Sequence, residues 1–481
     1  MMDWSRRLQL PLLALLSFAG YTLLALNFPL VPFYRQLPLS DVRTFTPSLV
    51  GGVAYALLLL ALFALFALGY HRVRHKGTSL RLLVLVTALF ALPLLFTYPI
   101  NANDIFRYFV RARILTVHGA SPLAVPPAAF PDDAFLQFAG EWVDETSPYG
   151  PVWELTAAAV SLVAGKRLLL ALLLLKGLAL LAHLGSGVLI WRLLPAHKAE
   201  QRAASTLLWL WNPALLLIFV VNGHNDGLML FWLLLGWWVI VRGQRPLTGF
   251  LILILGPLTK LIALLPLPYL FLGVWRALPE QRQRWRFLLL APVGAAALGI
   301  LAFLPFGSPI ELGLRLVREA SGGAGFSPLA LLVLLSRRLG TDLSLGAANV
   351  IGTLLFLAIT LWLLWRSGRE RRPLGSAGDI FAAYLFTAAT FRLWYAVWPF
   401  PWYLLDQGHR RDAPAPDGQP LEARLVGNLL FLLLTQISVV LYGHLRVYLL
   451  GGNHLAAHLI GVPATFALPL LVAVASQRSR R

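Results

Sequence analysis

The amino-acid composition predicts an all-α protein, a polytopic transmembrane helical bundle. Of the 481 residues, 58% are hydrophobic and only 13% are charged, and the mean hydropathy is +0.72. A chain of this size has too little polar surface to cover a water-soluble globule. Many of its apolar stretches approach or exceed the roughly 20 residues that a helix needs to cross a bilayer of about 30 Å. We therefore expect residues 1–481 to form a single integral membrane domain with about 12–14 spans.

The expected spans are apolar runs separated by short polar or basic segments. The run at 247–275 contains Pro257, Pro266 and Pro268, so it is predicted to form two short segments rather than one straight helix. Shorter runs at 151–165 and 326–337 could be half-helices or tilted spans. The long runs lie at 8–30, 48–70, 79–98, 168–193, 205–221, 227–241, 247–275, 287–306, 344–365, 378–396, 424–448 and 454–475.

Basic residues give the chain a formal charge of +19. They occur in short bursts between apolar runs, as at 71–76 and 366–372, which is the positive-inside pattern of membrane proteins rather than a nucleic-acid-binding stripe. Membrane lipids, and no nucleic acid, are therefore the expected surroundings. The first apolar run follows Arg6 and Arg7 but is long and lacks a clean small-residue cleavage site, which favours a retained anchor. The absence of cysteine excludes disulfides and thiolate metal ligands.

Orientation follows from the basic bursts. If the burst at 71–81 is cytoplasmic, residues 99–150 form the first large extracytoplasmic loop, and this loop is acidic. Counting back from Arg242 places residues 222–226 on the same side, provided that an odd number of crossings separates residues 150 and 204. The topology of the C-terminal third stays open, because cytoplasmic basic segments at 366–374 and at the C-terminus conflict with three spans between them.

The first polar patch reads NANDIFRYFVRARILTVHGASPL from Asn101. Apolar and basic residues alternate through 105–115 as in an amphipathic juxtamembrane helix, with Asn103 or Asp104 as its cap. In one interpretation the patch is only a capped helix with arginines that extend to the membrane surface. In the other, the Asp104 carboxylate is a potential base beside phosphate-binding donors, the side chains of Arg107, Arg111 and Arg113.

The segment SPYGPVWE at 147–154 returns the chain to the membrane. Pro151 suits the first turn of a helix, and the helix dipole favours a negative charge at Glu154 in that turn. Earlier in the loop, Asp132 and Asp133 are a possible site for a divalent metal, although adjacent carboxylates in a Pro-rich loop are usually only solvated.

The second polar patch, Asn222-Gly223-His224-Asn225-Asp226, lies between two strongly apolar runs. A turn at a membrane edge explains asparagine and glycine, with Asn225 or Asp226 as a helix cap, but does not call for histidine and aspartate as well. His224 and Asp226 could hold a substrate hydroxyl or a metal, and one histidine with one carboxylate is a weak metal signal.

These stretches together resemble a known family. NDIFRYFVRARILTVHGASPL, SPYGPVW, WNPALLLIFVVNGHNDGLML, GPLTKLIALLPLPYLF and PFPWYLL follow one another as in bacterial polytopic glycosyltransferases of the GT-C superfamily. The chain most resembles the polyprenol-phosphate-mannose-dependent mannosyltransferases of the cell envelope, over residues 100 to 405. Where many GT-C enzymes carry two acidic residues spaced by one, this chain has Asn103-Asp104, which leaves metal dependence open. After the PWY motif it carries a polar loop, residues 404–423.

The resemblance implies a membrane enzyme that moves a sugar, mannose in similar proteins, from a polyprenyl-phosphate carrier to a lipid-linked or cell-envelope glycan acceptor on the outer face. Asp104 would be the catalytic base, and Lys260, which falls where similar proteins carry a basic residue, could bind the carrier phosphate. For Arg107, Arg111 and Arg113 the same role is inferred from their charge, not from the resemblance. No cofactor is firmly implied. The complete set of expected substrate-binding residues is Asn103, Arg107, Arg111, Arg113, Tyr149, Glu154, Asn222, His224, Asn225, Asp226, Lys260 and Trp402.

Two other functions compete with this interpretation. Pro-broken helices and intramembrane charges also mark lipid or anion transporters and flippases, but those predict repeated halves, and the sequence shows no internal repeat. In a non-catalytic envelope-assembly partner, Asp104 would be dispensable. Most of the 16 tryptophans suit interface belts, while Trp394, Trp398 and Trp402 could also stack on a sugar.

Overall fold

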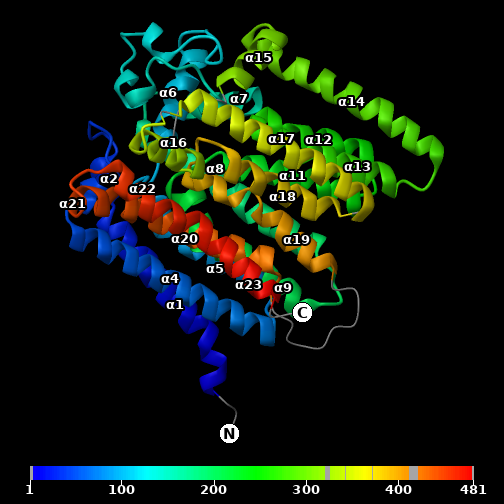
Figure 1. Cartoon of the computed structure of the whole chain (residues 1–481), viewed down its shortest axis with the longest axis horizontal. Coiled ribbons are helices and arrows are strands. Elements are labelled where there is room, and N and C mark those ends of the chain that lie inside the picture. The colour runs from blue at the N-terminus through cyan, green and yellow to red at the C-terminus, as the bar shows by residue number, and fades with distance from the viewer. Residues whose placement is uncertain (1–3, 320–324, 342, 371, 411–420, 479–481) are drawn as a thin grey trace. The chain divides into compact units, whose positions relative to one another are not determined.

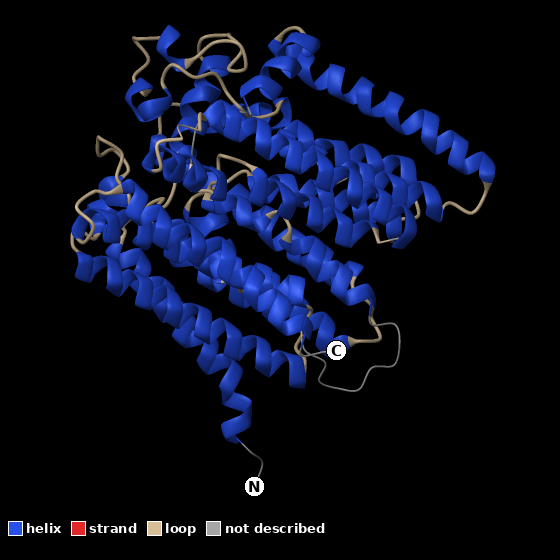
Figure 2. Cartoon of the chain, in the orientation of Figure 1, coloured by secondary structure: helices blue, strands red, loops and turns tan. Residues whose placement is uncertain are grey.

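The computed structural model describes residues 4–319, 325–341, 343–370, 372–410 and 421–478. Over these ranges the chain forms helices and no β-strand, and a lone bridge pairs Pro29 with Thr97 (Figure 2). The predicted all-α class is confirmed.

The helices, drawn in chain order in Figure 1, form two compact units by their internal contacts. The first comprises residues 1–45, 62–264 and 274–320, and the second residues 46–61, 265–273 and 321–481. Two helices, α4 (Leu49–Lys76) and α13 (Leu267–Ala277), contribute residues to both units. The single domain expected from the sequence therefore consists of two separately packed parts.

The helices of the first unit surround the candidate site. They are α1 (Trp4–Asn27), α2 (Leu30–Phe33), α3 (Val42–Phe45), α5 (Leu80–Leu95), α6 (Asp104–Thr116), α7 (Pro151–Ala164), α8 (Leu168–Leu193), α9 (Ala199–Leu210), α10 (Pro213–Leu216), α11 (Asp226–Val241), α12 (Pro246–Thr259), α14 (Gln281–Phe303) and α15 (Pro309–Glu319). Short 3-10 turns lie at Pro127–Ala129, Leu136–Trp142, Leu261–Leu264 and Leu304–Phe306, and a π-helical turn at Leu217–Val221.

The second unit is also helical. It contains α16 (Pro328–Arg338), α17 (Leu345–Glu370), α18 (Pro373–Thr387), α19 (Phe400–Arg410), α20 (Ala423–Val440), α21 (Arg446–Tyr448), α22 (His454–Val462) and α23 (Leu468–Arg478), with a 3-10 turn at Leu393–Val397 and π-helical turns at Leu441–Leu445 and Pro463–Ala467.

Fewer helices than predicted are long enough to cross a bilayer unaided. Among the described residues, seven helices pass on length and hydropathy, and an eighth span would be the pair Ala199–Leu210 and Pro213–Val221, bent by 41°. Five further apolar helices have only 10–17 residues. One of them is α12, which ends before Lys260, so the predicted division of 247–275 into two short segments is confirmed. The chain is a polytopic helical bundle in which several predicted spans are short or broken helices.

Two predicted segments differ in extent from the structure. The run at 378–396 is helical only to Thr387, where α18 ends, and continues as an irregular segment into the 3-10 turn at Leu393. In the predicted polar loop at 404–423, residues 404–410 continue α19 and Ala423 begins α20, while residues 411–420 lie outside the described residues.

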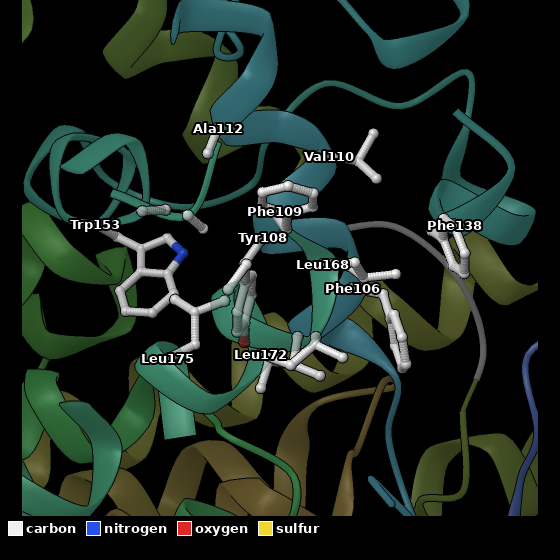
Figure 3. Close-up of a cluster of buried hydrophobic side chains, with 14 of the residues drawn as sticks. Phe106, Tyr108, Phe109, Val110, Ala112, Phe138, Trp153, Leu168, Leu172 and Leu175 are labelled. Carbon is white, nitrogen blue, oxygen red and sulfur yellow. The ribbon is translucent and has the colours of Figure 1, made fainter. Parts of the chain in front are cut away.

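The predicted helix at 105–115 exists as α6, but it does not lie on a surface. Every residue from Asp104 to Ile114 is buried. Its apolar side chains pack with Trp153 of α7, with Leu168, Leu172 and Leu175 of α8 and with Phe138 (Figure 3). An arginine-bearing helix can be buried only where other segments supply partners for each guanidinium, and these partners define the candidate site.

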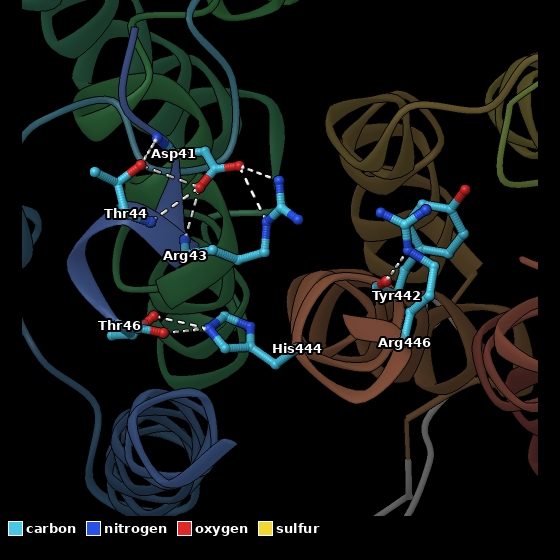
Figure 4. A network of polar contacts seen from close by, with 7 residues as sticks. All are labelled: Asp41, Arg43, Thr44, Thr46, Tyr442, His444 and Arg446. Atoms are coloured by element: carbon cyan, nitrogen blue, oxygen red, sulfur yellow. Dashed lines mark hydrogen bonds and ion pairs between the residues drawn. The ribbon is translucent and has the colours of Figure 1, made fainter. Parts of the chain in front are cut away.

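Several polar side chains of the second unit have partners within that unit. Nε2 of the buried His444 lies 2.8 Å from Oγ1 and 3.0 Å from the carbonyl oxygen of Thr46 (Figure 4). Asp379 forms an ion pair with Arg366 and accepts a hydrogen bond of 3.2 Å from the Tyr403 hydroxyl. The Asp379 contacts link α18 to α17 and α19, and the His444 contacts link the turn Leu441–Leu445 to the segment before α4.

Candidate active site

Asp104 begins α6 and is 7% exposed. Its Oδ1 accepts a hydrogen bond of 2.8 Å from Nη1 of Arg107, one turn further along the helix. Asn103 does not cap α6 with its side chain as predicted, because its Oδ1 accepts instead from Nη2 of Arg107 at 2.8 Å. The Arg107 guanidinium also stacks on Trp142, with its carbon 5.2 Å from the ring centroid. Arg107 therefore fixes the position of the Asp104 carboxylate.

The turn that carries the second polar patch packs directly against α6. It follows the π-helical turn Leu217–Val221 and changes direction at Gly223, whose φ is +65°. A Cβ atom at Gly223 would lie 2.5 Å from Cδ1 of Ile105, so only glycine allows both the conformation and the close approach. Asn222 Oδ1 accepts a hydrogen bond from the backbone N–H of Asn101. The two polar segments, about 120 residues apart in sequence, meet here.

His224 lies between two carboxylates. Its Nδ1 is 3.9 Å from Oδ2 of Asp104 and 3.9 Å from Oδ2 of Asp226, and the residue is 1% exposed. Burial lowers the pKa of His224 to about 4, although the two carboxylates oppose this shift. The imidazole is therefore neutral near pH 7 and can both donate and accept a hydrogen bond.

Asp226 opens α11 and forms an ion pair with Lys260, the residue that follows α12. Nζ of Lys260 lies 2.9 Å from both carboxylate oxygens of Asp226, whose side chain is fully buried. Helices α11 and α12 pack together along their length and so hold this pair in place. We call Asp104, Arg107, His224, Asp226 and Lys260 the charged cluster. It contains two cations, two carboxylates and a neutral imidazole, so its charges balance without a ligand.

Two tyrosines border the charged cluster. The ring of Tyr149 lies beneath Lys260, 5.9 Å from Nζ, and packs edge-on against Tyr108 at 5.3 Å. Burial raises the pKa of Tyr149 well above its ordinary value, and the negative charge of Asp104 raises it further, while Arg111 opposes the shift. Both phenols are therefore neutral hydroxyl groups close to the carboxylates. Tyr108 is not among the site residues predicted from the sequence.

Arg113, predicted to bind a phosphate, binds Asp133 instead. Its Nε lies 3.0 and 3.1 Å from the two Asp133 oxygens, and Nε2 of His118 lies 2.8 Å from the second. Burial alone would raise the pKa of Asp133. Hydrogen bonds from Arg113, from the backbone N–H of Phe135 and from His118 outweigh this effect and lower that pKa below its ordinary value. This network fastens the Pro-rich loop to the end of α6. It also occupies one carboxylate of the possible Asp132-Asp133 metal site, and the described residues include no group of three or more His, Asp and Glu side chains suited to a metal ion.

Arg111 and Glu154 both bind the loop that precedes α7. Nη2 of Arg111 donates to the backbone oxygen of Glu145 at 3.3 Å, and Glu154, in the first turn of α7 as predicted, accepts a hydrogen bond from the Ser147 hydroxyl. Arg111 is 4% exposed and, among the described residues, forms no ion pair of the kind that holds Arg107 and Arg113. Its charge instead acts over a longer distance on the Glu154 carboxylate and on Tyr149.

Two further predicted residues have different surroundings. Asn225 occupies the cap position of α11 without a capping hydrogen bond, is 1% exposed, and its side-chain amide makes no hydrogen bond within the described part of the chain. Its amide is thus available to a ligand hydroxyl. Trp402 is fully buried in α19 of the second unit. A sugar-stacking role for Trp402 stays a prediction.

The depressed pKa of His224 predicts a specific dependence of stability on pH. Between pH 6.5 and 4 the unfolded chain protonates this histidine and the folded chain does not, so its contribution to stability falls as pH falls. In His224→Gln this contribution is absent. From pH 7 to pH 4.5, the unfolding free energy of wild type should therefore fall by on the order of 2 kcal/mol more than that of the variant. Thermal unfolding in detergent at a series of pH values measures it, and a difference that does not vary with pH would contradict a buried neutral imidazole.

Comparison with known families gives a match that covers this site. Residues 13–276 match the family model described as Alpha-(1->6)-mannopyranosyltransferase, N-terminal domain. The chain is 27% identical over 345 residues to Alpha-(1->6)-mannopyranosyltransferase A of Mycobacterium tuberculosis, covering 65% of this chain and 63% of that protein. It is 22% identical over 339 residues to the protein of the same name in Corynebacterium glutamicum, covering 63% of this chain and 67% of that protein.

The matches cover only part of each relative. A Mycolicibacterium smegmatis protein named probable alpha-(1->6)-mannopyranosyltransferase is 24% identical, over 64% of this chain and 62% of that protein. The chain thus spans less than two thirds of the length of the two mycobacterial relatives. No solved structure matches. The family match includes every member of the charged cluster, since all five lie between residues 104 and 260.

Proposed function

Because the chain belongs to the family described as Alpha-(1->6)-mannopyranosyltransferase, N-terminal domain, we propose that it transfers a mannosyl residue from a polyprenyl-phosphate-linked donor to a hydroxyl group of a lipid-linked or cell-envelope glycan. The observation that carries the proposal is the charged cluster, in which a neutral histidine lies between two buried carboxylates, Asp104 held by Arg107 and Asp226 paired with Lys260. The names of the relatives favour an α-(1→6) linkage in the product.

The reaction forms a bond between the acceptor oxygen and the anomeric carbon and breaks the bond between that carbon and the phosphate oxygen. The acceptor hydroxyl loses its proton as the new bond forms, and Asp104 is the proposed acceptor of that proton. A positioned base of this kind contributes roughly a hundredfold to ten-thousandfold in rate. Arg107 holds the Asp104 carboxylate through one oxygen, Oδ1, and leaves Oδ2 on the side of His224.

Departure of the polyprenyl phosphate requires positive charge near the leaving oxygen. Lys260 and Arg111 are the best candidates. Lys260 lies over the Tyr149 ring, and the charge of Arg111 acts on the same tyrosine. Arg107 and Arg113 are engaged by Asp104 and Asp133, so we assign them to holding the base and the loop rather than the phosphate. A lipid-borne donor also suits a chain in which no glycine-rich nucleotide-binding motif occurs.

The orientation of the site is part of the proposal. Basic bursts at 71–76 and 242–245 place those segments on the cytoplasmic side by the positive-inside rule. One apolar helix, α5, leads from the first burst to Asp104, and another, α11, leads from Asp226 to the second. Both therefore support a charged cluster on the extracytoplasmic side.

The test is mannosyl transfer by the purified full-length protein in detergent or nanodiscs. Radiolabelled polyprenyl-phosphate mannose is supplied with a lipid-linked mannoside acceptor, and a nucleotide-linked mannose serves as the control donor. We expect transfer from the lipid-borne donor alone, with an α-(1→6) linkage in the product. Transfer only from the nucleotide-linked donor would refute the donor assignment. If no donor supports transfer but the labelled lipid crosses the bilayer of proteoliposomes, the chain is a flippase and the proposed function is wrong.

A further inference from the structure

Glu154, expected from the sequence to bind substrate, contacts the cluster only through other residues. It is 2% exposed in the first turn of α7, and its Oε1 accepts a hydrogen bond from Oγ of Ser147. The same Ser147 oxygen accepts a hydrogen bond of 3.3 Å from the backbone N–H of Tyr149. Ser147 is fully buried, and its own N–H donates to the carbonyl oxygen of Pro122. Because the Ser147 oxygen accepts from the Tyr149 N–H, its own hydroxyl proton is donated to Glu154.

The next residue along the turn binds the segment that carries Lys260. The N–H of Gly150 donates to the carbonyl oxygen of Thr259 at 3.1 Å, immediately before Lys260. A Cβ atom at Gly150 would lie 2.1 Å from the carbonyl oxygen of Leu258, so the backbones touch and no side chain fits between them. The turn at 147–150 is therefore in direct contact with the end of α12.

Lys260 is held at its backbone where α12 ends. It follows the last residue of α12 with extended dihedral angles, φ −151° and ψ 120°; its N–H donates to the carbonyl oxygen of Gly256 at 2.9 Å, and its carbonyl oxygen accepts from the N–H of Ala263 at 3.0 Å. Its ammonium must nevertheless reach both Asp226 oxygens and the face of Tyr149. The turn at 147–150 adds two contacts that place this side chain, one at the Thr259 carbonyl and one through the ring of Tyr149.

We infer that Glu154 and Ser147 are positioning residues that set the place of the Lys260 ammonium by holding the turn at 147–150 against the end of α12. Glu154 orients Ser147, Ser147 orients the backbone of Tyr149, and Tyr149 and Gly150 together fix Lys260. Groups that place a charged side chain within a site commonly matter as much as the side chain itself, since displacement by about 1 Å can cost on the order of a hundredfold in rate. The inference rests on the proposed function for its kinetic consequence but not for its geometry.

The test uses three variants of the full chain. Glu154→Ala removes the acceptor of the Ser147 hydroxyl, Glu154→Gln keeps an oxygen that can accept it, and Thr156→Val is the matched control. Thr156 lies on the same helix and binds the carbonyl oxygen of Val152, away from the turn. The first readout is independent of activity. Isotopic reductive methylation followed by mass spectrometry measures the reactivity of Lys260, with the exposed Lys166 as internal reference.

In wild type, Lys260 should react much more slowly than Lys166, because its side chain is 13% exposed and its ammonium is paired with Asp226. Glu154→Ala should raise its rate several-fold relative to Lys166, while Glu154→Gln and Thr156→Val should leave it close to the wild-type value. The second readout is mannosyl transfer, where Glu154→Ala should lower kcat by on the order of a hundredfold with little change in donor KM, and Glu154→Gln should restore most of it.

Unchanged Lys260 reactivity in Glu154→Ala would overturn the inference. So would a Glu154→Gln variant as impaired as Glu154→Ala, because the negative charge itself would then be required, as in direct substrate binding. If wild type transfers no sugar but the reactivity of Lys260 responds as expected, the proposed function fails and the positioning role stands.

Discussion

Asp104→Asn is expected to lower kcat for mannosyl transfer by between about a hundredfold and ten-thousandfold, because the carboxamide cannot take up the proton of the acceptor hydroxyl. The substitution keeps the shape of the side chain, and the amide oxygen can still accept a hydrogen bond from Arg107. This bond, 2.8 Å long in wild type, is then no longer part of an ion pair. We expect a loss of stability of about 1 to 3 kcal/mol from the less compensated guanidinium, which is 8% exposed. Steady-state transfer kinetics and thermal unfolding, measured on the same preparation, separate the two effects.

The matched control is Asp132→Asn, since Asp132 is an exposed carboxylate in the loop that follows the same helix. It should retain wild-type transfer and unfolding temperature. A donor KM in Asp104→Asn that stays near the wild-type value would place the loss in the chemical step rather than in binding. Equal kcat values for wild type and Asp104→Asn would remove this carboxylate from the mechanism.

Features that depend on residues close in sequence could be predicted, whereas features that depend on distant residues could not. Residues 168–193 were predicted as a span and form α8 with the same bounds, because 26 residues of mostly apolar sequence need no distant partner to specify a helix. The start of α6 at Asp104 and of α7 at Pro151 likewise follows from local chemistry. The predicted span 378–396 is wrong beyond Thr387, because the helix ends there although the apolar sequence continues.

The burial of α6 could not be predicted, because it depends on distant partners. A helix with three arginines at 107, 111 and 113 is normally exposed on that face. In this chain Arg113 pairs with Asp133, twenty residues away in a Pro-rich loop, and Arg111 binds a backbone oxygen at Glu145. Neither partner has a sequence signature. The same holds for the pairing of Asp226 with Lys260, where each residue was predicted to be functional but their contact follows only from the packing of α11 on α12.

The Asp226–Lys260 pair allows the structural and chemical roles of a buried charge to be separated. Lys260→Met leaves the Asp226 carboxylate, which is fully buried, without its cation, and breaking such a pair typically costs about 3 to 5 kcal/mol. A second substitution, Asp226→Asn, removes the uncompensated charge. The double variant Asp226→Asn/Lys260→Met should therefore regain most of the unfolding free energy lost in Lys260→Met, giving a coupling energy of at least about 2 kcal/mol in a double-mutant cycle.

Activity should not follow stability in that cycle. If Lys260 stabilises the departing phosphate, the double variant stays impaired by on the order of a hundredfold in kcat although it folds like wild type, because no cation remains at that position. A double variant that recovers both stability and transfer would show that the pair serves only to hold α11 against α12. Arg111 would then be the residue that stabilises the departing phosphate. A double variant as unstable as Lys260→Met would instead mean that Asp226 is stabilised by its other neighbours. Asp226 begins α11, Lys260 follows α12, and their charges lie 2.9 Å apart, so a recovery of folding without a recovery of chemistry is the result that ties the geometry of this cluster to catalysis.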